Sequence, residues 1–141
     1  MSNLGNLNTQ LTTMRESFIL DLTEESLKAL IEGKTTISNL LNMLFMNGAE
    51  GASKLLTALI GYHWFEGGAP DYKNLRIIDC HLDIRTLNGF MQIAYLLERT
   101  FGCADIQTKQ TENQKWHFSI NETSAIIIFE GPNDPSRQDE I

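Results

Sequence analysis

The sequence predicts an α+β fold in which N-terminal helices pack on a largely antiparallel sheet of about four strands, with one long crossover helix. Two patterns carry this prediction. Apolar residues first recur at the spacing of a buried helix face, and from residue 78 they alternate with polar residues, as in a half-buried strand. Helices that precede the strands, and do not alternate with them, indicate an α+β arrangement.

The first half of the chain contains the start and stop signals of three helices. Thr23 is a favourable N-cap, and Glu24 and Glu25 follow it in the first turn, where the helix dipole favours negative charge. Gly33 is a suitable end for this helix. We expect a short strand at residues 18–22 and helices at residues 23–33, 36–48 and 49–65.

The second half is expected to supply most of the sheet and the crossover helix. Its strongest helical pattern spans residues 86–101, where one face would carry Leu87, Phe90, Met91, Ala94, Leu97 and Phe101. The polar stretch Thr111–Gln114 suits a hairpin turn. We therefore expect strands at residues 78–84, 104–110, 115–120 and 124–130.

The last expected strand, "SAIIIFE", is apolar on both faces. Such a strand is either central in the sheet or covered by another subunit, because an exposed strand of this character invites aggregation. We predict a homodimer that uses the segment Ala125–Phe129.

The length and composition of the chain limit its possible domain organisation and its binding partners. We expect one domain at residues 14–131, between a flexible arm at residues 1–13 and a flexible tail at residues 132–141. The net charge of -7 repels phosphates and anionic lipids, so neither nucleic acid nor a membrane is expected as a partner. The same field would attract a cationic ligand or a basic protein; the alternative is that the acidity only serves solubility. Two cysteines without a CxxC spacing indicate a reducing, cytoplasmic location, and no cofactor is predicted.

A cluster of polar residues forms the first candidate site. Asp79, His81 and Asp83 alternate on one face of a strand, and His117 points away from the apolar side of another. If the two strands are neighbours, imidazole and carboxylate groups could bind zinc or another divalent ion. The alternative is a polar strand face that is simply solvated.

The stretch "GYHWFEGG" is the second candidate. His63 lies where the apolar stripe of a helix ends, between Tyr62 and Trp64, and Glu66 precedes two glycines. These residues could form the rim of a ligand pocket. Alternatively, they are the amphipathic end of a helix, where each ring buries its body and keeps a polar tip in water.

Residues 75–120 resemble the four-vinyl-reductase-like small-ligand-binding domains. The resemblance rests on "NGF" at residues 88–90, "TFG" at 100–102 and "WHFSI" at 116–120, which occur in the family's order. It implies helices before a mixed sheet and a small, largely apolar ligand between helices and sheet, with Tyr62, His63, Trp64 and Phe90 at the ligand. Members with cysteines near the strand pair differ from this chain, which has Gln110, Thr111 and Lys115 there.

Three functions follow from these residues, in descending order. The first is a non-enzymatic cytoplasmic binding module for a small apolar ligand or a protein partner. The second is an acidic inhibitor or immunity-type protein that neutralises a basic protein through its carboxylates. The third is a metal-dependent enzyme that uses the His81/His117 face.

Overall fold

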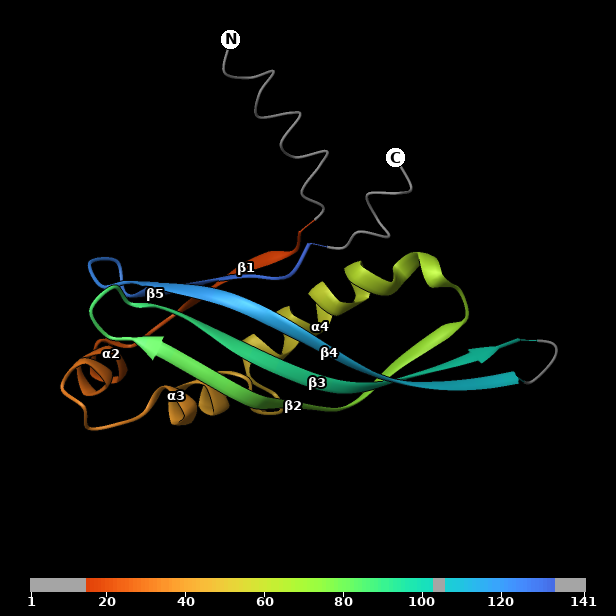
Figure 1. Ribbon diagram of the computed structural model, residues 1–141, viewed down its shortest axis with the longest axis horizontal. Helices are drawn as coiled ribbons and strands as arrows, with labels where there is room; N and C mark the ends of the chain where they lie inside the picture. The colour runs from red at the N-terminus through yellow and green to blue at the C-terminus, as the bar shows by residue number, and fades with distance from the viewer. Residues whose placement is uncertain (1–14, 103–105, 134–141) are drawn as a thin grey trace, which may run out of the picture.

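The computed structural model describes residues 15–102 and 106–133. These residues form an α+β fold with three α-helices and a five-stranded antiparallel sheet in the order β1-β5-β4-β3-β2 (Figure 1). The predicted arm at residues 1–13 lies outside the described part of the chain, as do residues 134–141 of the predicted tail. Within the described residues, no helix is both long and apolar enough to cross a bilayer.

The three helices form where the N-cap and stripe signals predict them. They are α2 (Glu24–Ile31), α3 (Ile37–Leu44) and α4 (Glu50–His63), and the 3-10 helix η1 (Trp64–Glu66) continues α4. The hydroxyl of Thr23 accepts a hydrogen bond from the Ser26 amide at 3.0 Å, and Thr36 caps α3 in the same way. Figure 1 shows the helices on one side of the twisted sheet.

The first and last strands lie side by side. β1 (Ser17–Asp21) forms one edge of the sheet and pairs with β5 (Ile126–Glu130), which pairs on its other side with β4 (Ile106–Asn121). The two-sided apolar strand is therefore central in the sheet. This position explains its composition, so β5 gives no support to a dimer that uses Ala125–Phe129.

The predicted crossover helix at residues 86–101 is wrong, because these residues contribute the strand β3 (Asn88–Phe101). β3 lies between β2 (Ala69–Asp83) and β4, so both of its faces carry apolar side chains. Met91, Ile93, Tyr95 and Leu97 face the helices and are buried. Apolar residues on both faces of a central strand also match a helical spacing by coincidence.

The other two corrections concern the lengths of β2 and β4. The predicted turn at Thr111–Gln114 does not exist, because β4 runs through it in unbroken register with β3. The paired strands β3 and β4 are separated in the chain after Phe101 and before Ile106 instead. β2 begins at Ala69, so most of the loop expected before residue 78 is strand, interrupted by register shifts between Lys73 and Arg76 and between Ile77 and Asp79. With β3 included, the sheet has five strands where about four were expected.

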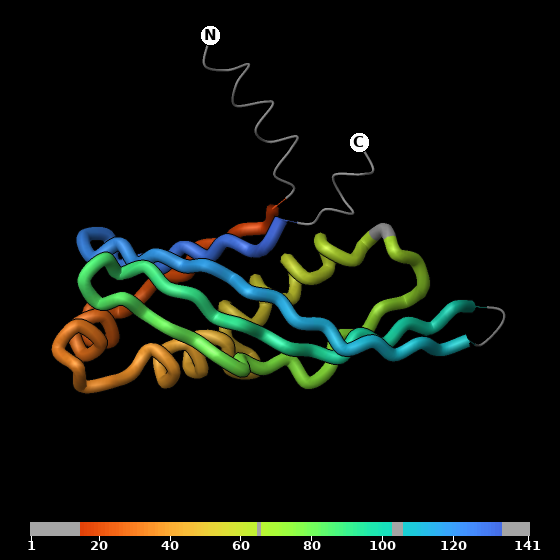
Figure 2. The backbone as a smooth tube through the Cα atoms, in the orientation of Figure 1, coloured from red at the N-terminus to blue at the C-terminus, as the bar shows by residue number. Residues whose placement is uncertain are grey.

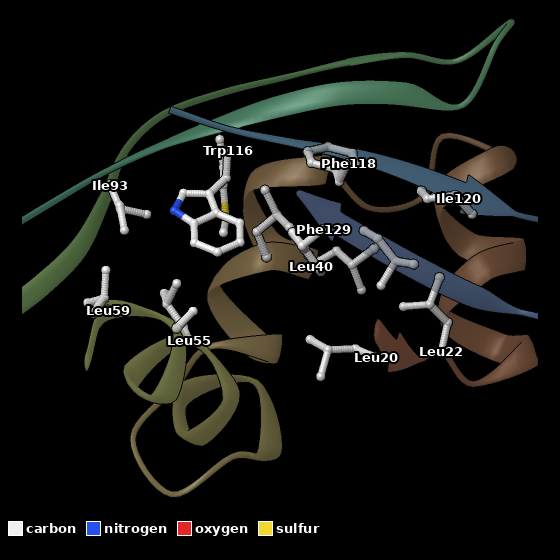
Figure 3. Close-up of a cluster of buried hydrophobic side chains, with 14 of the residues drawn as sticks. Leu20, Leu22, Leu40, Leu55, Leu59, Ile93, Trp116, Phe118, Ile120 and Phe129 are labelled. Carbon is white, nitrogen blue, oxygen red and sulfur yellow. The ribbon is translucent and has the colours of Figure 1, made fainter. Parts of the chain in front are cut away.

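One hydrophobic core fills the space between the helices and the sheet. Trp116, Phe118 and Phe129 project from the sheet into a cluster that includes Leu40 of α3 and Leu55 and Leu59 of α4 (Figure 3). The predicted inward direction of Trp116, Phe118 and Ile120 is confirmed, since all are buried. The interior between these layers is therefore packed with side chains.

Replacing Gly89 by alanine should destabilise the fold by about 2 kcal/mol. A Cβ atom at this position would meet the carbonyl oxygen of His81 and lie 2.7 Å from Cζ of Phe118. The backbone oxygen cannot rotate away, so β2 must shift. Urea unfolding measures the loss, and Gly102→Ala is the control because nothing lies within 4 Å of its added Cβ. Equal stability of the two variants would contradict the packing at Gly89.

Candidate functional site

Tyr62, at the end of α4, is buried and holds the two ends of the described chain together. Its hydroxyl donates to the carbonyl oxygen of Pro132 at 2.5 Å and accepts from the Glu16 amide at 3.2 Å. The ring packs edge-on against Trp116. Each polar atom of the phenol therefore has a structural partner, and Pro132, predicted to be in the tail, is part of the packed fold.

His63 is the centre of a partly buried polar network that joins α4 to β3. Only 8% of its surface is exposed. Its Nδ1 lies 3.0 Å from a carboxylate oxygen of Glu66, and its Nε2 lies 2.7 Å from the hydroxyl of Tyr95. Because a carboxylate only accepts, the neutral ring carries its proton on Nδ1, and Tyr95 donates to Nε2.

Two further polar residues complete this network, which we call the His63 network (His63, Glu66, Tyr72, Tyr95 and Arg99). The guanidinium of Arg99 pairs with the Glu66 carboxylate through Nη2. The ring of Tyr72 lies 6.1 Å from those of both His63 and Tyr95. Among the described residues, the Tyr72 hydroxyl and Arg99 Nε have no hydrogen-bond partner.

Burial controls the protonation of both tyrosines. It raises the pKa of Tyr95 well above the ordinary value, and the negative charge of Glu112 adds to this effect. Burial also raises the pKa of Tyr72. Both phenols therefore remain neutral in any physiological solution, and Tyr95 is a stable hydrogen-bond donor to His63.

The His63 network has the groups of an acid–base relay but lacks access. A carboxylate, an imidazole and a hydroxyl follow one another, as in activated nucleophiles. However, Tyr95 at the end of the chain is 0% exposed, and a general base or nucleophile must reach the reacting atom of a substrate. The network is suited to fixing the junction of α4, η1 and β2.

Sequence reasoning missed Tyr72, Tyr95 and Arg99. Tyr95 and Arg99 were placed on a helix and Tyr72 in a loop, so their approach to His63 could not be anticipated. A usable signal was present in the alternation of Met91, Ile93, Tyr95 and Leu97, which has the period of a strand.

The predicted ligand-binding residues do not surround one pocket. Tyr62 and His63 face the core, whereas Trp64 is 69% exposed. Phe90 precedes the buried Met91 in β3 and so lies on the opposite face of the sheet from the helices. Tyr62, Trp64 and Phe90 therefore cannot be walls of the same cavity.

The sheet face opposite the helices, which we call the open face, is covered by none of the helices (Figure 1). Polar and apolar side chains lie together on this face. Cross-strand pairing places His81 and His117 on either side of Phe90, and the ammonium group of Lys115 lies 4.3 Å from the Phe90 ring centroid. The partly exposed apolar side chains on this face are Ile19, Phe90, Leu96, Ile126 and Ile128.

The predicted metal ligands share the open face but are not drawn together there. Asp79, His81 and Asp83 follow one another along β2, and His117 is two strands away with Phe90 between the imidazoles. Two strand spacings are about 10 Å, and the Phe90 ring, 6.1 Å from that of His81, lies between the two imidazoles. In the described part of the chain, no group of three or more His, Cys, Asp and Glu side chains could hold a metal ion.

Comparison with protein-family models, with curated proteins and with solved structures finds no match for this chain.

Proposed function

We propose that the protein is a non-enzymatic, cytoplasmic binding module that holds a protein partner on its open face. The observation that carries the proposal is that all three helices pack on the same side of the sheet. The other side keeps five apolar side chains partly in contact with solvent: Ile19, Phe90, Leu96, Ile126 and Ile128. Exposed apolar groups within a polar surround are typical of protein-interaction sites.

The distribution of side chains on the open face matches the anatomy of an interface. Phe90 lies on this face between His81 of β2 and His117 of β4, and aromatic residues often dominate binding energies at interfaces. Acidic groups lie toward the outside, among them Asp21, Asp79 and Glu130. A partner with an apolar centre and basic residues around it fits both this pattern and the net charge of -7.

Phe90→Ala should weaken binding of the partner at least about tenfold and leave the fold intact. Partner proteins retained from a lysate by the immobilised full chain are identified by mass spectrometry, and the dissociation constant of the purified partner is then measured for each variant. Met43→Ala is the matched control, because Met43 is an exposed apolar residue of α3 on the helical side. Equal affinity of wild type and Phe90→Ala would contradict the open face as the binding site.

A second candidate function is neutralisation of a basic protein by a groove beside α2. The groove has a volume of about 410 Å³ and lies against the residues between β4 and β5. Leu27, Lys28 and Ile31 line it together with Glu24, Glu32 and Glu122. Glu32 is paired with Lys34 at 3.1 Å, so Glu24 and Glu122 are the carboxylates that would receive a lysine or arginine side chain. Binding that falls steeply with salt and is indifferent to Phe90→Ala would favour this candidate.

A further inference from the structure

One edge of β4 is left without a strand partner over more than half of its length. β5 pairs with β4 only from His117 to Asn121. From Ile106 to Trp116, β4 has β3 on one side and no strand on the other within the described residues. Figure 2 shows the β3–β4 hairpin extending well past the end of β5. We call residues 106–116 the free edge.

The free edge lacks most of the devices that protect the other strands from pairing. Natural sheets protect edges with bulges, prolines, a covering element or charged side chains, and of these, among the described residues, the free edge has only the charged side chains of Lys109, Glu112 and Lys115. At the opposite end of the sheet, β2 has two register shifts and lies against α3. The free edge has neither a proline nor a register shift along β3, so its amide and carbonyl groups form a regular row.

The charges of the free edge are compatible with pairing to a second copy of the chain. The whole protein carries -7, which repels its own copies, but the free edge has two lysines and one glutamate. Two identical strands pair antiparallel about a two-fold axis, and the middle residue of the free edge is Thr111. An axis at Thr111 would align the full length of both edges.

Side chains would be compatible in this register. Lys109 would face Asn113, and Lys115 would face Gln107, so no two like charges would be opposite. Gln110 would face Glu112, and amide, hydroxyl and carboxylate groups form hydrogen bonds across strands. In contrast, an axis at Glu112 would set Lys109 against Lys115 and Glu112 against itself.

We propose that the free edge of β4, Ile106–Trp116, pairs antiparallel with the same edge of a second copy about a two-fold axis at Thr111. The axis is perpendicular to the sheet, so the two sheets become one continuous sheet with both sets of helices on the same side. The two open faces then form one surface. This dimer does not use Ala125–Phe129.

Thr111→Lys tests the pairing, because it sets a lysine against its own copy at the axis. Thr111 is exposed, so the monomer should fold normally, which circular dichroism checks. Sedimentation equilibrium of the full chain should show a dimer for wild type and for the control Thr111→Ser. For Thr111→Lys the dissociation constant should rise about fivefold or more, as expected for one like-charge pair.

Thr111→Glu should weaken the dimer as well, because the two introduced carboxylates would face each other at the axis. A tighter dimer would instead indicate that the introduced carboxylate faces Lys109 of the other copy, which would overturn the register. A monomeric wild type, or a dimer unchanged by Thr111→Lys, would overturn the proposal. So would protection of residues 106–116 from hydrogen exchange that is lost on deleting residues 134–141, since the occupant would then be the chain's own tail.

Discussion

Trp116→Ala is expected to lower the free energy of unfolding by about 4 kcal/mol, the largest effect of any single substitution considered. Trp116 is 0% exposed, and its ring lies 5.4 Å from that of Phe18 and 6.2 Å from that of Tyr62. Its loss leaves a cavity between the sheet and the end of α4, which a rigid core cannot close completely. Urea denaturation followed by circular dichroism measures the change.

The second tryptophan provides the control for this prediction. Trp64→Ala is the same chemical change at a side chain that is 69% exposed, and it should cost less than about 1 kcal/mol. In Trp64→Ala the remaining fluorescence comes from Trp116 and should be shifted to the blue until the protein unfolds. Similar costs for the two substitutions would mean that Trp116 is not at the centre of the core.

His63→Ala is expected to lower the free energy of unfolding by about 3 kcal/mol. The substitution removes a buried ring and leaves the Tyr95 hydroxyl without its acceptor in the protein interior. It also separates Glu66 from α4, although the carboxylate keeps its contact with Arg99. Thermal and urea unfolding measure the loss, and His117→Ala, at an exposed histidine, should change stability by less than about 0.5 kcal/mol.

A double-mutant cycle assigns this loss to the hydrogen bond. Tyr95→Phe removes the same interaction from the other side, so its effect and that of His63→Ala should be non-additive by about 1 kcal/mol. If His63 instead lined an accessible pocket, its substitution would weaken ligand binding and barely change stability. A stability loss under about 0.5 kcal/mol would therefore contradict the structural role of the His63 network.

The helical half of the fold could be predicted because its signals are local. Thr23 and Thr36 cap helices at the expected positions, and the stripe of α4 leads to His63 as anticipated. The sheet depends on partners that are distant in the sequence. β3 has apolar side chains on both faces, so its sequence lacks a clean alternation, and the order of the strands is not encoded in any short window.

The same limit applied to the candidate site. His63 was identified from its position on α4, but Tyr95 reaches it only because β3 is a strand in the middle of the sheet. His81 and His117 were correctly placed on polar faces of strands, yet their separation depends on β3 lying between β2 and β4. Side-chain direction along one strand is a local property, whereas strand order and register are not.

The pairing of β1 with β5 controls when the chain can complete its fold. During synthesis, the segments of α2 to α4 leave the ribosome early, and their local contacts can form at once. β1 leaves even earlier but has no strand to join until residues 126–130 have been made. The sheet therefore cannot be completed before residues 126–130 have been made, and apolar β1 residues such as Phe18 have no strand partner until then. Because Tyr62 also holds Glu16 close to Pro132, a short linker between these positions should allow a circular permutant in which β1 follows β5 directly.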